Sequence, residues 1–101
     1  MILVIIRMRV FPEKHLELSQ TISLLSGSIR IEKGCNRCDF CQSNEDENRL
    51  FLLEEWETQE NFKDHLKSER FRVLRGAMSL LQDPYEIMFH TVSYPAGLEK
   101  V

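Results

Sequence analysis

The sequence predicts a single α+β domain with the ferredoxin-like order βαββαβ and a four-stranded antiparallel sheet that carries its helices on one face. Three observations lead to this prediction. The chain has 101 residues, the size of one domain. Segments with the apolar period of strands and of helices follow one another in that order. The four glycines and three prolines fall mostly between these segments, where turns are needed.

The first half of the chain is expected to contain a strand, a helix and a second strand. Residues 1–11 are rich in Ile and Val and predict a strand that ends at Pro12. Pro12 suits the first turn of a helix, which we expect to run to about Glu32. Gly34 is then expected to stop this helix in a left-handed conformation, and residues 35–43 to form the next strand. Apolar residues at spacings of four, three and four form one stripe of the helix: Leu18, Ile22, Leu25 and Ile29.

The second half is expected to begin with a hairpin. Residues 44–48 are polar and lie between two strand-like runs, of which the second covers residues 49–57. Thr58 can cap the following helical region, which continues to Gln82. Ser68 is a second candidate cap, so we expect this region to be broken into two helices.

The last strand is expected at residues 85–94, after the helix breaker Asp83-Pro84. Residues 94–101 then form a tail with one proline and one glycine. We therefore predict one domain over residues 1–93 and a C-terminal tail over residues 94–101.

Both faces of the predicted sheet are apolar, although two helical regions can cover only one face. Leu3 and Ile5 lie on the face of the first strand that is opposite its fully apolar face. The third strand is apolar on both sides as well, with Leu50 and Leu52 alternating with Phe51 and Leu53. A second copy of the chain is the simplest cover for the remaining face, so we expect a twofold homodimer.

Composition excludes several classes of protein. The 13 Lys and Arg residues are outnumbered by 16 Asp and Glu, and a net charge of -3 argues against nucleic acid or an anionic membrane surface as a partner. The longest apolar run, residues 1–6, is far shorter than the ~20 residues of a membrane helix. It also lacks the basic segment that precedes the apolar core of a secretory signal. We expect a cytoplasmic protein whose three cysteines are free thiols.

A set of motifs from Gly34 onward points to a family. Gly-Cys-x-Arg at residues 34–37 opens a strand, Leu-Glu-Glu-Trp at residues 53–56 closes the hairpin, and a helical region carries Phe62, His65 and Phe71. The Trp-to-His spacing is nine and the His-to-Phe spacing is six. In this order the motifs resemble the antibiotic biosynthesis monooxygenase family of small dimeric α+β barrels, over about residues 1–93.

This resemblance implies several activities. Some family members are cofactor-free oxygenases of polyketide phenols or quinols, others degrade heme or act on small phosphorylated sugars, and many have no known reaction. The heme-degrading branch is similar in using an Asn of the first strand, a Trp, and an axial His in the last helical region. Here the first strand has no Asn and residues 71–82 contain no His, which argues against a heme role.

His65 and Trp56 are the candidate catalytic residues. A cofactor-free oxygenase must deprotonate a phenol or enol, and an imidazole with an ordinary pKa of roughly 6.5 suits that task. The resemblance places Trp56 at or near the cavity, where an indole can stack on a planar substrate. The alternative is a structural histidine and a core tryptophan.

Candidate substrate-binding residues are polar groups on the predicted strands. Arg7 and Arg9 share a strand face about 6–7 Å apart and could hold an anion, or pair with acids of neighbouring strands. Glu54 shares the face of Trp56 and is an alternative base, or an ion-pair partner. His90 lies in the last strand, where either the cavity or the dimer interface could contain it.

The cysteines read C-x-x-C-x-x-C, yet we predict no metal site. A step of three along a strand spans about 10 Å and reverses the face, so these thiols cannot converge on one ion. Cys38 is retained as a candidate substrate-binding or reactive thiol, at a position where family members often carry Tyr.

The leading hypothesis is a monooxygenase without cofactor that acts with molecular oxygen on a small planar phenol, quinol or similar aromatic. One alternative is a barrel that binds a small hydrophobic ligand without turnover. The other is a heme-binding member of the family.

Overall fold

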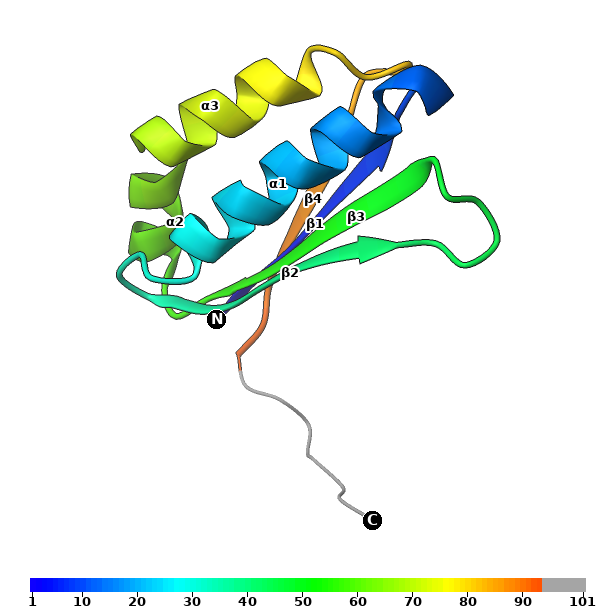
Figure 1. Cartoon of the computed structure of the whole chain (residues 1–101). Helices are drawn as coiled ribbons and strands as arrows, with labels where there is room; N and C mark the ends of the chain where they lie inside the picture. Colours follow the sequence, from blue (N-terminus) through cyan, green and yellow to red (C-terminus); the bar gives the residue numbers. More distant parts are fainter. Residues whose placement is uncertain (94–101) are drawn as a thin grey trace.

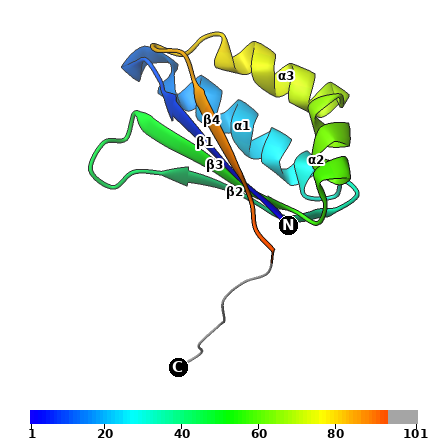
Figure 2. The ribbon, with the colours of Figure 1, turned by 180° about the vertical axis from the view of Figure 1, so that it is seen from behind.

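The computed structural model describes residues 1–93 and contains the predicted four-stranded antiparallel sheet, in the order β2-β3-β1-β4 (Figure 1). The helices all lie on one face of this sheet, as the two opposite views show (Figures 1 and 2). The predicted fold class is therefore confirmed. The elements are β1 (Ile2–Arg9), a 3-10 turn (Pro12–Lys14), α1 (His15–Ile29), β2 (Cys35–Gln42), β3 (Arg49–Trp56), α2 (Gln59–Leu66), α3 (Glu69–Met78) and β4 (Glu86–Thr91).

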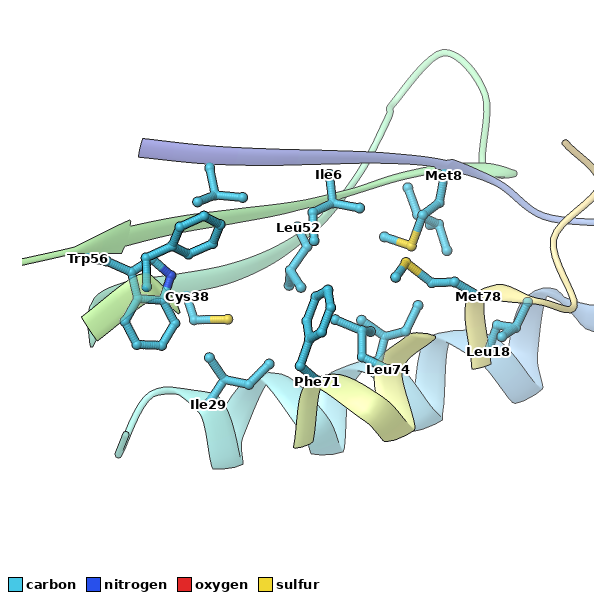
Figure 3. Packing of buried hydrophobic residues seen from close by; sticks show 14 of the residues in the cluster. Ile6, Met8, Leu18, Ile29, Cys38, Leu52, Trp56, Phe71, Leu74 and Met78 are labelled. Atoms are coloured by element: carbon cyan, nitrogen blue, oxygen red, sulfur yellow. The ribbon is translucent and has the colours of Figure 1, made fainter. Parts of the chain in front are cut away.

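The inner face of the sheet, which the helices cover, carries the core. In β1 the even-numbered residues from Ile2 to Met8 are buried, and in β3 the even-numbered residues from Leu50 to Trp56 are buried. Side chains of α3 point at this face, where Phe71, Leu74 and Met78 approach the sheet residues (Figure 3). Apolar burial of this kind, at roughly 25 cal/mol per Å², is the main stabilising term of the fold.

The helix α1 is shorter than the sequence predicts. The segment at Pro12 forms a 3-10 turn, and α1 ends at Ile29, about three residues before the predicted end at Glu32. Gly34 does take a positive φ of 82°, but it lies beyond the helix end and does not stop the helix. Its carbonyl instead accepts a hydrogen bond of 2.7 Å from the backbone N–H of Glu57, which joins the start of β2 to the end of β3.

The second helical region is broken in two, as predicted. The Thr58 hydroxyl accepts a hydrogen bond from the Asn61 N–H and caps α2. The Ser68 hydroxyl accepts from the Phe71 N–H and caps α3. The helix α3 ends at Met78 rather than at Gln82, because residues beyond Met78 make turn-type bonds such as Leu81 N–H to the Met78 carbonyl.

The hairpin between β2 and β3 has the predicted turn at residues 44–48, and its pairing aligns Cys38 with Glu54. A β-bulge interrupts this pairing between Cys35 and Arg37. The fourth strand is shorter than the predicted residues 85–94, and the predicted tail at residues 94–101 lies outside the described residues.

The outer face of the sheet has no helix on it among the described residues. Half-buried apolar side chains lie there in register, with Ile5 opposite Leu53 on one side and Met88 on the other. This is the face for which the sequence predicts a second copy, and the dimer remains a prediction. Among residues 1–93 no helix is both long and apolar enough to cross a membrane.

Candidate functional site

A cluster of polar side chains is buried between the sheet and the helices. His65, Glu54 and Trp56 each expose 1 % or less of their surface. The Glu32 side chain reaches the same place and exposes 11 %. We call these four residues the histidine–carboxylate cluster. Ionisable groups are seldom fully buried unless they are paired, so this set is the most unusual feature of the interior.

Three elements bring the cluster together. Glu54 and Trp56 lie two residues apart on β3, so both point to the inner face of the sheet. His65 lies in the last turn of α2, on the face that also carries the buried Phe62. Glu32 comes from the turn between α1 and β2, which returns the chain to the sheet edge near α2.

The two imidazole nitrogens of His65 have different surroundings. The Nδ1 atom lies 3.0 Å from Oε2 and 3.2 Å from Oε1 of Glu32, within hydrogen-bond distance. The Nε2 atom is 3.7 Å from Oε1 of Glu54, too far for a hydrogen bond, and has no other partner. Donation of the Nδ1 proton to Glu32 leaves the Nε2 lone pair available as a base.

Trp56 fixes Glu54 and covers His65. The indole Nε1–H donates a 2.8 Å hydrogen bond to Oε1 of Glu54. The indole and imidazole rings stack with centroids 4.5 Å apart and planes 27° apart, and the Phe71 ring meets the imidazole edge-on at 5.4 Å. Aromatic rings on two sides therefore hold the imidazole plane fixed.

Glu54 is the perturbed acid of the cluster. Burial raises the pKa of its carboxyl above the ordinary value of 4.5, and the carboxylate of Glu32 acts in the same direction. The hydrogen bond from Trp56 and the nearby His65 partly oppose this rise in pKa. The Oε2 atom of Glu54 is buried without a hydrogen-bond partner, as is Nε2 of His65. These two unpartnered polar atoms leave hydrogen-bonding capacity inside the cluster that a ligand or a water molecule can satisfy.

Cys38 lies directly opposite Glu54 in the sheet and is 1 % exposed. Burial, followed by the charge of Glu54, raises the pKa of its thiol. A thiol that stays protonated is a poor nucleophile, which argues against a reactive thiol at Cys38, and its role as a substrate-binding residue stays a prediction. Trp56 and Cys38 both belong to the buried core between the sheet and the helices (Figure 3).

The other predicted site residues lie on the opposite face of the sheet. Arg7 and Arg9 alternate with the buried residues of β1 and are exposed, and His90 pairs with Leu3 on the same outer face and is exposed too. The sheet separates these residues from the histidine–carboxylate cluster. The residues predicted for one site therefore lie on two different faces of the sheet.

The cysteines do not converge on a common point. Cys38 is on the inner face, whereas Cys41 pairs with Phe51 on the outer face. Within residues 1–93, no group of three His, Cys, Asp or Glu side chains is arranged to hold a metal ion.

Glu32 is the residue that sequence reasoning missed. It was expected at the end of a helix, where a glutamate is ordinarily solvated. No local pattern marks it, because its contact with His65 joins residues 33 positions apart in the chain.

Comparison with protein families gives one decisive match. The model of the antibiotic biosynthesis monooxygenase family matches residues 1–76. The chain belongs to this family. The match covers β1 to most of α3, and thus the whole histidine–carboxylate cluster. No curated protein matches the chain.

Solved structures agree with the family fold. A protein from Nitrosomonas europaea, provisionally named an antibiotic biosynthesis monooxygenase, is 20% identical with a TM-score of 0.86, and the match covers 93% of this chain and 100% of that one. A protein of the same provisional name from Deinococcus radiodurans is 15% identical with a TM-score of 0.89. The match covers 99% of this chain and 100% of that one. A conserved protein from Methanosarcina mazei is 28% identical with a TM-score of 0.83. The match covers 88% of this chain and 89% of that one.

Proposed function

We propose that this family member is a monooxygenase that needs no cofactor and acts on a small planar phenol or quinol. One observation carries the proposal. His65 is held at Nδ1 by Glu32, while its Nε2 atom is buried, free of any hydrogen bond and close to Glu54. An imidazole that an acid orients on one side and that is open on the other is the arrangement of a general base.

The reaction needs only a base, oxygen and an enclosed space. His65 takes the hydroxyl proton, and the electron-rich phenolate transfers one electron to molecular oxygen. The resulting radical and superoxide combine at a ring carbon that bears hydrogen, which forms a C–O bond. Loss of that ring proton and cleavage of the O–O bond release water and leave a second ring carbonyl. The balance is one phenol and one O2 giving one quinone and one water.

The neighbours of His65 have defined tasks in this scheme. Trp56 keeps the imidazole in place by stacking on it, and it lines the same enclosed space that a planar substrate would enter. Burial raises the pKa of Glu54, whose carboxyl lies beside Nε2 of His65 and in its neutral form would donate a hydrogen bond to the developing oxyanion or peroxide oxygen. Because His65 and Trp56 are closed from solvent, α2 and α3 must move away from the sheet to admit the substrate.

The direct test is oxygen uptake with a panel of phenols and quinols. We expect His65→Gln to lower the rate about 100-fold, the scale of general-base catalysis, and Trp56→Phe to raise KM. The matched control is His15→Gln, since His15 lies at the start of α1 and, among the described residues, its side chain hydrogen-bonds only to Gln42. Retention of full activity in a folded His65→Gln variant would show that this residue is not the base.

The second candidate function is a barrel that binds a small hydrophobic ligand without converting it. The aromatic rings of Trp56 and Phe71 on two sides of His65 favour an apolar ligand at this place. This candidate predicts a higher Tm in the presence of such a ligand and no oxygen consumption. Turnover of any member of the panel decides against it.

A further inference from the structure

Two polar atoms of the histidine–carboxylate cluster have no hydrogen-bond partner among the described residues. They are Nε2 of His65 and Oε2 of Glu54, on side chains that are each 1 % exposed. The other polar atom of each side chain is engaged, since Nδ1 of His65 lies 3.0 Å from Glu32 and Oε1 of Glu54 accepts the Trp56 N–H. The cluster can therefore take two more hydrogen bonds, and their partners must come from a ligand or from water.

The two unpartnered atoms are close neighbours. Nε2 of His65 lies 3.7 Å from Oε1 of Glu54, and Oε2 is the second oxygen of that same carboxyl group. A hydroxyl oxygen lies about 2.7–2.8 Å from an oxygen that accepts its hydrogen bond. A single hydroxyl has only one proton to donate, so two hydroxyls held side by side match this pair of atoms better than one.

A hydroxyl group suits both atoms in either protonation state of the carboxyl group. When Nδ1 of His65 donates its proton to Glu32, Nε2 is an acceptor. Oε2 of Glu54 accepts a hydrogen bond when the carboxyl is ionised and can donate one when it is neutral. A hydroxyl donates in the first case and accepts in the second, so it pairs with Oε2 in both.

The charges and rings around the pair favour an uncharged aromatic ligand. Among the described residues, His65 is the only ion-pair partner of Glu32 and of Glu54, so no arginine or lysine balances the two carboxyl groups. A carboxylate or phosphate on the ligand would be buried beside them without a cation, which is costly. The rings of Trp56 and Phe71 lie on two sides of the imidazole and favour a flat apolar body.

We propose that the ligand of this cluster is a catechol, an uncharged aromatic ring with hydroxyl groups on two adjacent carbons. One hydroxyl donates a hydrogen bond to Nε2 of His65, and the adjacent hydroxyl pairs with Oε2 of Glu54. This inference rests on the proposed function, because it names the substrate class of the same site. It narrows the phenols and quinols to those whose two hydroxyls are adjacent.

The test is binding of catechol and its two isomers, resorcinol and hydroquinone, to the full chain in the absence of oxygen. The three compounds have the same atoms and differ only in the spacing of their hydroxyls. Trp56 is the only tryptophan of the chain and lies in the cluster, so quenching of its fluorescence reports binding. We expect catechol to bind about tenfold more tightly than either isomer or phenol, because a site that pairs with a hydroxyl rejects a ligand that lacks one there.

Two variants of neighbouring residues locate the preference. Glu54→Leu removes both carboxyl oxygens and should abolish the preference for catechol over its isomers. Glu55→Leu is the matched control, since Glu55 is the next residue of β3 and faces the other side of the sheet, and it should keep the preference. If Glu54→Leu does not fold, Glu54→Met takes its place, because the methionine side chain matches glutamate in length.

The inference is overturned if catechol does not bind, or if a folded Glu54 variant keeps the full preference for it. Equal binding of catechol, its isomers and phenol also overturns it, and would assign the two unpartnered atoms to a buried water molecule. Failure of the proposed function gives a different result. Catechol then binds with the expected preference, whereas oxygen uptake with catechol and with the rest of the panel stays at zero.

Discussion

The carboxyl group of Glu54 shows how much a single residue can change the stability of this protein with pH. It is almost completely buried, it accepts one hydrogen bond from Trp56, and its second oxygen has no partner. Burial raises the pKa of this carboxyl in the folded protein, and so favours the neutral form there relative to the unfolded chain. The unfolded chain loses this proton near the ordinary pKa, whereas the folded protein holds it to higher pH.

Glu54→Gln should therefore stabilise the protein at neutral and basic pH. With a pKa raised by folding, the contribution of Glu54 to the free energy of unfolding is complete below pH about 4.5 and is lost as the pH rises through the folded-state pKa. Gln keeps an acceptor for the Trp56 N–H and cannot ionise. We expect urea unfolding to give little difference in the free energy of unfolding at pH 4 and a higher value for the variant at pH 8.

Glu55→Gln is the control for this experiment, because Glu55 is next in the chain and faces the other side of the sheet. The difference in free energy of unfolding between Glu55→Gln and the wild type should not increase with pH. If Glu54→Gln were instead less stable at pH 8, the carboxylate would be an ionised and stabilising partner of His65.

At the scale of residues, the sequence identifies candidate side chains of the site but not all of the residues that these side chains contact. Glu54 and Trp56 were assigned to one strand face, because alternation along a strand is strict. His65 was recognised as a candidate base from its residue type and from the family motif. Its partnership with Glu32 depends on where the turn after α1 crosses α2, and local patterns carry no information on that crossing.

At the scale of elements, Gly34 ties the start of β2 to the N-terminus of α2. Its φ of 82° is a conformation that costs an L-residue roughly 1–2 kcal/mol. A Cβ atom at this position would also overlap the side chain of Asn61. That side chain accepts a 2.7 Å hydrogen bond from the Thr58 hydroxyl, which caps α2.

Glycine-to-alanine substitutions should therefore change the free energy of unfolding in opposite directions at Gly34 and at the two helical glycines. We expect Gly34→Ala to lower the free energy of unfolding by more than about 1 kcal/mol through its φ and the displacement of Asn61. Gly27→Ala in α1 and Gly76→Ala in α3 are controls, as nothing lies within 4 Å of the added carbon. Each should raise stability by roughly 0.5–1 kcal/mol, measured by thermal or urea unfolding. A neutral Gly34→Ala variant would contradict this account.

The sequence predicts which segments form helices and strands more accurately than it predicts where these helices and strands end. The break at Ser68 was predicted because a capping hydroxyl is a local signal. The early end of α1 at Ile29 is not predicted by the sequence, because residues 30–33 contain no glycine or proline and continue the helical pattern. The turn there is set by contacts such as the 2.7 Å hydrogen bond from Arg30 Nε to the Cys38 carbonyl.

At the scale of the whole molecule, the outer sheet face predicts association. Ile5 lies between Leu53 and Met88 at its centre, and no helix covers these residues within the described chain. We expect sedimentation equilibrium at about 10–50 µM to show a dimer, the commonest closed assembly. Ile5→Lys should dissociate it, because a charge would be placed in an apolar contact.

Leu24→Lys is the matched control, since Leu24 is a 77% exposed leucine of α1 on the opposite side of the molecule from this face. It should leave the assembly intact. A wild-type protein that stays monomeric throughout this concentration range would refute the predicted dimer, and the fold itself would be unaffected.

The bulge between Cys35 and Arg37 has a consequence for how the protein behaves at high concentration. Among the described residues β2 pairs with β3 alone, so one side of its backbone is free to recruit a strand from another molecule. Such open strands are where amyloid-like growth begins, and an irregularity in the pairing, together with charges such as Arg37 and Asp39, disfavours it. We therefore expect the irregular start of β2 to disfavour the addition of a strand from another molecule at this edge.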